Sequence, residues 1–285
     1  MKPIVYCVYA EYFDFNFDLD KSIEIFVDTF IKDGKTTNLK IFIAMEPDVI
    51  SGLSDAIIHN QNDFDYILTF DNKILSNCKN SVLFEYGTTW IDSRFYNFPT
   101  KNFSVSTVCG HKQVTQNHRL RKRLWYRQNE IKIPTDFYRS NWGSTHHSVL
   151  TEFQVPPASD GGVENINNNK ILGDSKLSLF DSMFHICIEN SSQDYYFSEK
   201  LIDCLLTKTI PVYLGCTNIQ NYFNIDGFVL CKNEDEIISS CNCLTEEFYN
   251  SKKDVIEENY KKAINWISYK DRLENKLKEI IFHIN

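Results

Sequence analysis

Residues 184–215 read FHICIENSSQDYYFSEKLIDCLLTKTIPVYLG and carry the strongest signal for the fold. Residues 184–188 form an apolar run of the length of a buried strand, and residues 209–214 form a second one. Between them, apolar residues repeat at helical spacing over 197–205. A strand–helix–strand unit crosses over right-handed, which puts the loop and helix start 189–200 beyond the carboxyl end of a parallel strand. Open α/β sheets bind their ligands at that edge, so we expect a ligand site here.

The charges at this helix start favour an anionic ligand. Ser198 can cap the helix and Glu199 suits its positive end, so helix stability alone explains both. Lys200 opposes the macrodipole by a few tenths of a kcal/mol, unless it is simply a solvated surface lysine. A bound phosphate would make the position of Lys200 favourable, because free backbone N–H groups and a lysine together form an anion site. The residues directly after the strand add polar groups suited to a ribose or sugar: Glu189, Asn190 and Ser191.

Residues 188–229 resemble the signature region of the α1,3/4-fucosyltransferase family, whose pattern runs ENS, Tyr, TEK, IPIYWG and Phe-Val. The match covers about forty residues with several positions fixed in order, which makes it far more specific than a lone glycine motif. The resemblance implies a nucleotide-sugar donor site and supports the transferase class better than the identity of the donor. The donor-binding residues that it implies are Glu189, Asn190, Ser191, Tyr195, Tyr196, Ser198, Glu199 and Lys200.

Composition bounds the remaining possibilities. The chain has 285 residues, of which 42% are hydrophobic, enough for two domains with their own cores. Its net charge of -8 argues against a general nucleic-acid binder. The nine cysteines are spread out and form no paired CxxC framework, and Cys241 and Cys243 form a CxC pair that we interpret as incidental. Reduced thiols in a cytoplasmic protein are the natural interpretation.

The first residues, MKPIVYCVYAEYFDFNF, show neither a signal peptide nor a membrane span, because acidic residues interrupt the apolar run. Golgi members of the resembled family begin with a membrane anchor. We therefore expect a cytoplasmic enzyme of bacterial or viral type, or a shortened chain.

The pattern predicts three parts: a domain over 1–99, a second domain over 100–245, and helices over 246–285 that pack back across both. In the first domain we expect strands at 4–9, 39–44, 66–70 and 82–84 and a helix over 23–31. A Pro-, Gly- and Asn-rich stretch at 155–169 is expected to be a loop or lid within the second domain. Alternating strands and helices predict Rossmann-like layers in an α/β fold.

The second domain begins with a strand at 102–108, a glycine turn and the basic helical stretch QNHRLRKRLWYRQ. A glycine turn leading into a helix start is a common way to hold a diphosphate, although most arginines of such a stretch form a solvated face. The resembled family places a donor-binding arginine at such a helix start. Arg121 corresponds best, and Arg119 is the alternative.

Two α/β domains facing each other across a cleft form the GT-B architecture. The resemblance implies inversion by a single displacement, in which a carboxylate of the first domain takes the proton of the acceptor hydroxyl. Lys200 and Arg121 would stabilise the leaving diphosphate without a metal or other cofactor. Glu46 follows a strand and is our choice for the base, against an exposed loop acid as the alternative. Asp71 is the runner-up, and Glu11 and Asp92 follow.

A metal-dependent GT-A enzyme would need a DxD pair. Two such pairs exist, Asp18 with Asp20 and Asp63 with Asp65, but acids two apart are common in so acidic a chain, and we expect no metal site. His146 and His147 also lack the spacing of metal ligands.

The expected reaction moves a sugar, with GDP-fucose as first choice, to a hydroxyl of a glycan acceptor. Two alternatives stay open. One is a UDP-sugar transferase, such as a xylosyltransferase of viral or bacterial glycan synthesis. The other is a nucleotide- or sugar-binding protein without catalysis.

Overall fold

The computed structural model describes residues 3–7, 22–29, 38–96, 100–139, 170–171 and 176–282. Contacts divide the chain into two compact units. The first comprises Met1–Gly87, Asp194–Tyr196 and Ser268–Asn285, and the second Thr88–Gln193 and Phe197–Ile267. Each unit contains its own parallel sheet. These two sheets confirm the predicted α/β class with two Rossmann-like domains, as in GT-B enzymes.

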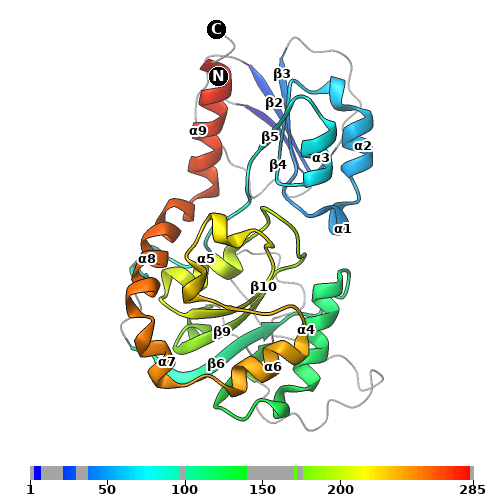
Figure 1. Ribbon diagram of the computed structural model, residues 1–285. Coiled ribbons are helices and arrows are strands. Elements are labelled where there is room, and N and C mark those ends of the chain that lie inside the picture. The colour runs from blue at the N-terminus through cyan, green and yellow to red at the C-terminus, as the bar shows by residue number, and fades with distance from the viewer. Residues whose placement is uncertain are drawn as a thin grey trace. The chain divides into compact units, whose positions relative to one another are not determined.

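The sheet of the first unit has five strands in sequential order, β1-β2-β3-β4-β5, and every pair of neighbours is parallel (Figure 1). Ile25, on the second strand of the sheet, pairs with Val5 on one side and Ile41 on the other. The strands are β1 (Ile4–Cys7), β2 (Ile23–Val27), β3 (Leu39–Ile43), β4 (Tyr66–Thr69) and β5 (Ser81–Leu83).

Alternate residues of these strands pack against two different layers of helices. Ile25 and Ile41 belong to the core cluster that includes α9, whereas Phe26 and Phe42 belong to the cluster formed with α2 and α3. Figure 1 shows α9 on one side of this sheet and α2 and α3 on the other. The helices of this unit are α1 (Asp48–Ser51), α2 (Ser54–His59), α3 (Asn72–Asn77) and α9 (Tyr269–Phe282).

The predicted helix over 23–31 is wrong, because Ile23–Val27 is strand β2, buried on both faces. Apolar residues at 23, 26 and 27 fit a helical period, but they fit a strand covered on both sides equally well. The polar residue inside this segment, Glu24, is buried and compensated: it accepts a hydrogen bond from Asn38 Nδ2 (3.1 Å) and lies 3.9 Å from Lys40 Nζ.

The second unit has a six-stranded parallel sheet in the order β11-β10-β9-β6-β7-β8. Counted from β6, this is the order 3-2-1-4-5-6 of the doubly wound dinucleotide-binding fold. From β6 the following strands are added on one side of the sheet, and from β9 they are added on the other, so the direction changes between these two neighbouring strands. The strands are β6 (Asn102–Cys109), β7 (Thr135–Arg139), β8 (Lys170–Ile171), β9 (Ser182–Ile188), β10 (Ile210–Leu214) and β11 (Val229–Leu230).

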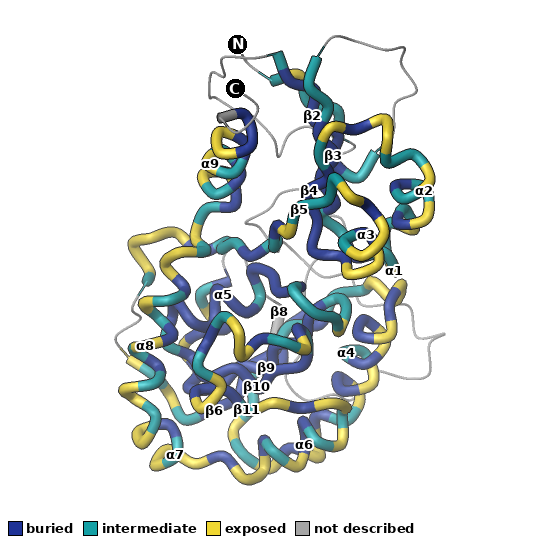
Figure 2. The backbone as a smooth tube through the Cα atoms, turned by 45° about the horizontal axis from the view of Figure 1, so that its top comes forward, coloured by how far each residue is buried: buried dark blue, intermediate teal, exposed yellow. Residues whose placement is uncertain are grey.

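Helices cover both faces of this sheet, and Figure 2 shows the buried interior along β9 and β10. Leu124 of α4 and Ile237 of α6 belong to the core on one face, and Leu201 of α5 and Ala263 of α8 to the core on the other. The helices are α4 (Gln116–Tyr126), α5 (Glu199–Leu206), α6 (Glu234–Asn242), α7 (Glu246–Ser251) and α8 (Lys253–Ala263).

The contacts divide the chain at Gly87, before the predicted boundary at residue 99. Of the predicted C-terminal helices, α7 and α8 belong to the second unit and α9 to the first. The predicted loop 155–169 lies outside the described residues. No disulfide links the nine cysteines, all of which the structure describes. In the described segments, no helix is both long enough and apolar enough to cross a bilayer.

Candidate functional site

The predicted donor-binding loop lies at the switch point of the second sheet. The chain leaves β6 towards α4 and β7, and leaves β9 towards α5 and β10, so the two connections diverge from neighbouring strands. Ligands of doubly wound sheets bind outside the carboxyl ends of such a pair of strands. Residues from the start of α4 and from the loop 189–198 surround this position.

Glu189, the first residue after β9, holds the end of the loop 189–198 in place through hydrogen bonds to Ser198. It is completely buried, and its two carboxylate oxygens accept hydrogen bonds from Ser198 N (2.9 Å) and Ser198 Oγ (2.6 Å). Burial raises the pKa of Glu189, and the positive charge of Lys200 opposes that rise. Glu189 therefore fixes the start of α5, and its contact with a donor stays a prediction.

Gly215 makes room for this support. A Cβ atom at Gly215 would lie 2.5 Å from Glu189 Cγ and 2.6 Å from the Tyr213 hydroxyl. That hydroxyl accepts a hydrogen bond from Cys216 N (2.9 Å). Only a glycine therefore lets the chain after β10 pass so close to Glu189.

The start of α5 carries a compact group of charges. Ser198 is the N-cap, and its Oγ accepts a hydrogen bond from Lys200 N (3.3 Å). Lys200 Nζ lies 2.9 Å from Glu199 Oε1 and 3.3 Å from Ser198 Oγ. Although burial acts to raise the pKa of Glu199, the charges of Lys200 and Lys176 hold it at about 2. Glu199 is thus a permanent anion that orients Lys200.

A buried ion pair lies behind Glu199. Lys176 Nζ donates to Asp203 Oδ2 (2.8 Å) and lies 3.9 Å from Glu199 Oε1. Asp203 Oδ1 accepts hydrogen bonds from Thr89 Oγ1 (2.6 Å) and Trp90 N (2.9 Å). The negative charges around Lys176 overcome its burial and raise its pKa. Sequence analysis missed this network, because residues so far apart in the chain carry no local signal.

The start of α4 forms the other side of the expected ligand position, outside the carboxyl ends of β6 and β9. Thr115 and His118 form a capping box, in which His118 Nδ1 accepts a hydrogen bond from Thr115 N (3.2 Å). Burial and the nearby Arg121 lower the pKa of His118 to about 4, so its imidazole is neutral. Asn117 Nδ2 donates to Ser192 Oγ (3.0 Å), which ties α4 to the loop after β9.

Arg121 lies in the second turn of α4, one turn beyond the helix start at which the sequence places it, and its guanidinium reaches the end of β9. Its Nε and Nη2 both donate to the Ile188 carbonyl (3.1 and 2.7 Å), and Nη2 also donates to Asn190 Oδ1 (2.8 Å). Arg119 is exposed, and its Nη1 donates to the carbonyls of Gln113 and Val114. Arg121 therefore joins the predicted loop residues, and Arg119 does not.

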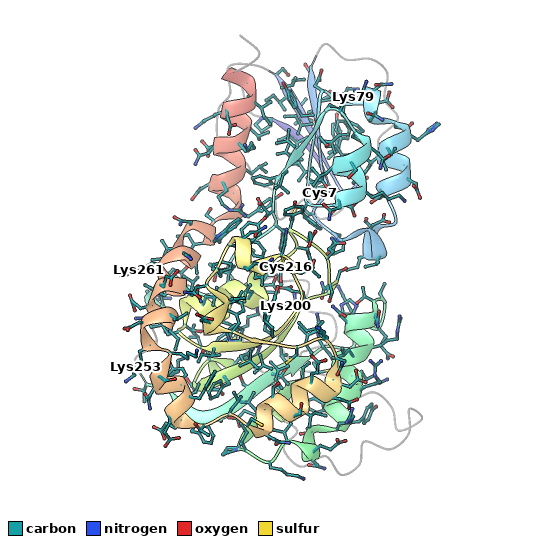
Figure 3. All side chains as sticks on the ribbon, in the orientation of Figure 1. Cys7, Lys79, Lys200, Cys216, Lys253 and Lys261 are labelled. Carbon is teal, nitrogen blue, oxygen red and sulfur yellow. The ribbon has the colours of Figure 1, made fainter. Side chains whose placement is uncertain are left out.

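The loops after β9 and β10 lie side by side, since Thr217 N donates to the Gln193 carbonyl (3.2 Å). Figure 3 labels Lys200, at the start of α5, and Cys216, in the loop after β10. The position thus combines two helix N-termini with the cations Lys200 and Arg121. Such a combination favours a diphosphate, because backbone N–H groups and positive side chains both point to an anion.

The other predicted donor residues are distributed as follows. Ser191 is half-buried in the loop after β9. Tyr195 has a left-handed backbone with φ of 64°. The Tyr196 ring packs on Phe70 with their centroids 5.0 Å apart, and both tyrosines are grouped with the first unit.

Two of the candidate bases lie in the first unit after neighbouring strands. Glu46 follows β3 and is half-buried, and its backbone N–H donates to Asp28 Oδ2 (3.1 Å). Asp71 follows β4 and caps α3, accepting hydrogen bonds from Lys73 N (2.8 Å) and Ile74 N (3.1 Å) on Oδ1. The capping role explains Asp71 structurally, which leaves Glu46 as the better candidate.

The remaining acidic residues are weaker candidates for the general base or for metal ligands. Asp92 is exposed and pairs with Arg94 (3.0 Å). Asp65 is exposed and accepts a hydrogen bond from Lys40 N (2.7 Å). Among the described residues, no group of three or more His, Cys, Asp or Glu side chains is arranged to hold a metal ion. Asp63 is exposed at the end of the short helical turn Gln61–Asp63. The other candidates named from the sequence lie outside the described residues: Glu11, Asp18, Asp20, His146 and His147.

The chain is similar to known glycosyltransferases. It is 32% identical over 115 residues to the α-(1,3)-fucosyltransferase FucT of Helicobacter pylori, a match that spans 37% of this chain and 22% of that relative. This match confirms the resemblance to fucosyltransferases. No protein-family model matches the chain.

Two solved structures are also similar. An α1,3-fucosyltransferase crystallised with GDP-fucose shares 18% identity at a TM-score of 0.48, over 83% of this chain and 69% of that one. The pneumococcal O-GlcNAc transferase GtfA in complex with UDP and GlcNAc shares 12% identity at a TM-score of 0.49, over 91% and 57%.

Proposed function

We propose that this protein is an inverting, metal-independent glycosyltransferase that moves a sugar from a nucleotide-sugar donor to a hydroxyl of a glycan acceptor. GDP-fucose is the donor that the similarity to FucT favours. One observation carries the proposal: the fucosyltransferase-like loop and the start of α4 come together at the switch point of a doubly wound sheet. That is where such a fold holds the diphosphate of a nucleotide.

In the proposed reaction the acceptor oxygen attacks the anomeric carbon while the bond from that carbon to the diphosphate oxygen breaks. The leaving nucleoside diphosphate gains negative charge. Lys200, Arg121 and the N–H groups at the start of α5 would stabilise that charge. Because Glu199 and Ser198 already orient the ammonium group of Lys200, little reorganisation is needed during the reaction.

The acceptor hydroxyl must lose its proton as it attacks. We propose Glu46 as the general base, because it follows a strand of the first unit, whereas the carboxylate of Asp71 is engaged in capping α3. Inversion follows from the single displacement. Asn190 and Ser191, in the loop after β9, would contact the ribose or the diphosphate.

A ligand panel followed by a turnover assay tests the proposal. Thermal shift with GDP-fucose, UDP-xylose, UDP-GlcNAc and a CDP-sugar, each with EDTA or with a divalent metal, identifies the donor. A ligand at a hundred times its Kd stabilises the folded state by about 2.7 kcal/mol, which is readily seen. We expect GDP-fucose to stabilise the protein in EDTA and to be turned over with a glycan or water as acceptor.

Other results of these two assays would identify one of the alternative functions or refute the proposal. Stabilisation by a UDP-sugar with turnover would identify a UDP-sugar transferase. Binding without turnover of any donor would identify a nucleotide-sugar-binding protein. Turnover that requires added metal would refute the metal-independent mechanism, and no binding of any nucleotide would refute the site.

A further inference from the structure

Asp28 is the first residue after β2 and lies beside the segment that carries Glu46. One carboxylate oxygen accepts a hydrogen bond from Met45 N (3.0 Å), and the other accepts one from Glu46 N (3.1 Å). Its own N–H donates to the Ile43 carbonyl (3.1 Å), so its backbone still follows strand β3. A single side chain thus clamps the two consecutive peptide groups that set the direction of Glu46.

The backbone of Asp28 is held in an uncommon conformation. Its φ is 46°, in the left-handed region that non-glycine residues rarely adopt. Residues in such conformations persist where the surrounding structure fixes them, and they are frequent at functional sites. Here the conformation ends β2 and leaves the side chain bound to the amides that follow β3.

The charge around Asp28 is also unusual for a residue with only a structural role. Burial raises the pKa of Asp28 to about 7, and the nearby charge of Glu46 adds to the rise, while the two backbone N–H groups oppose it. From α9, the buried Tyr269 also lies within electrostatic range of Asp28, and Arg272 lies within range of Tyr269. Burial thus disfavours the charged carboxylate, and the two backbone hydrogen bonds from Met45 and Glu46 favour it.

We propose that Asp28 is a positioning residue for the general base: it clamps the backbone of Glu46 so that the Glu46 carboxylate meets the acceptor hydroxyl in the correct orientation. This inference rests on the proposed function, in which Glu46 takes the acceptor proton. Each oxygen of Asp28 is engaged by a backbone amide of Met45 or Glu46, so we assign Asp28 the positioning of Glu46 and no step of the reaction itself. Its contribution is the fixed geometry of the base, and misplacement of a reacting group by about 1 Å can cost a hundredfold in rate.

A double-mutant cycle tests the proposal with GDP-fucose as donor and water or a glycan panel as acceptor. The variants are Asp28→Asn, Glu46→Gln and the double variant. Asn adopts the left-handed conformation readily, so the backbone of Asp28→Asn is preserved, and Asp28→Gly serves as a second variant should Asn fold poorly. The readouts are kcat, KM for GDP-fucose and the melting temperature.

Asp65 provides a matched control. It accepts a hydrogen bond from Lys40 N (2.7 Å), so Asp28 and Asp65 bind backbone amides at opposite ends of β3. We expect Asp28→Asn to lower kcat by about 10- to 100-fold with an unchanged KM for GDP-fucose. Asp65→Asn should leave kcat within about twofold. In the Glu46→Gln background, Asp28→Asn should change kcat by less than about twofold, because its effect passes through Glu46.

Three results would overturn the inference. An undiminished kcat in Asp28→Asn would show that the clamp is not needed. An equal loss of kcat with and without the Glu46 carboxylate would show that Asp28 acts independently, for instance as the base itself. A loss confined to melting temperature and KM would show a merely structural role. Full activity of Glu46→Gln would instead refute the proposed base, and no turnover by the wild type with any donor would refute the proposed function.

Discussion

Replacing Lys200 with methionine separates the proposed diphosphate site from an ordinary surface lysine. Methionine is unbranched like lysine and only one atom shorter, and it carries no charge. In the structure, Lys200 is oriented by Glu199 Oε1 (2.9 Å) and Ser198 Oγ (3.3 Å), and only 24% of its side chain is exposed. An ammonium held in this way would contact an anion without a further ordering cost.

The expected loss follows from the type of contact. A hydrogen bond to a charged group contributes about 1.5 to 3 kcal/mol, which corresponds to a Kd for GDP-fucose about 10- to 150-fold weaker in Lys200→Met. The folded protein without ligand should also lose stability, because the charge of Lys200 helps to keep the buried Glu199 ionised. Lys200→Arg keeps the charge and should lose less affinity.

Isothermal titration calorimetry with GDP and with GDP-fucose measures these affinities. Lys262→Met is the matched control, because Lys262 lies on α8 of the same unit and pairs with Glu258 (2.7 Å). It removes the same charge without touching the loop 189–198. If Lys200→Met bound GDP within about twofold of the wild type, Lys200 would be a surface lysine and the diphosphate assignment would fail.

Three further predictions concern the supports of the site and of the fold. Gly215→Ala should force Glu189 away from Ser198, costing about 1 to 3 kcal/mol in urea unfolding and weakening GDP binding by calorimetry; unchanged values would refute the close contact. Leu277→Ala on α9 should destabilise the fold by about 2 to 5 kcal/mol, whereas Lys278→Ala on the exposed side should cost less than about 0.5 kcal/mol. His118 is neutral in the folded state with a pKa of about 4, below its usual value, so its contribution to stability is lost as pH falls from about 6.5 to 4. His118→Asn should therefore lose about 2 to 3 kcal/mol less than the wild type over that range in urea unfolding, and equal losses would contradict the neutral imidazole.

Most of the fold could be predicted from local patterns. The apolar runs near residues 39, 66, 102, 184 and 210 all became parallel strands, because runs of this length bounded by turns are typical of buried strands. The segment Ile23–Val27 could not be assigned in this way. Its second face is covered by α9, whose residues lie at the other end of the chain, and no local window contains that information.

Only those residues of the site that belong to a recognisable sequence motif could be predicted. The position of Lys200 at a helix start and the family pattern predicted the loop, whereas the hydrogen bond from Arg121 to Asn190 was not predicted. The support role of Glu189 was not predictable, because its hydrogen bonds to Ser198 depend on how the loop closes. Asp28 gave no sequence signal at all, since its partners are set by the register between β2 and β3.

The central claim is that the switch point of the second sheet holds a nucleoside diphosphate. Hydrogen–deuterium exchange of the wild-type protein, with and without saturating GDP in EDTA, measures this most directly. The account predicts slower amide exchange at the start of α4 and across residues 189–202, because a diphosphate bound between these segments would order both of them. Protection confined to other segments, or none at a GDP concentration that saturates binding, would contradict it.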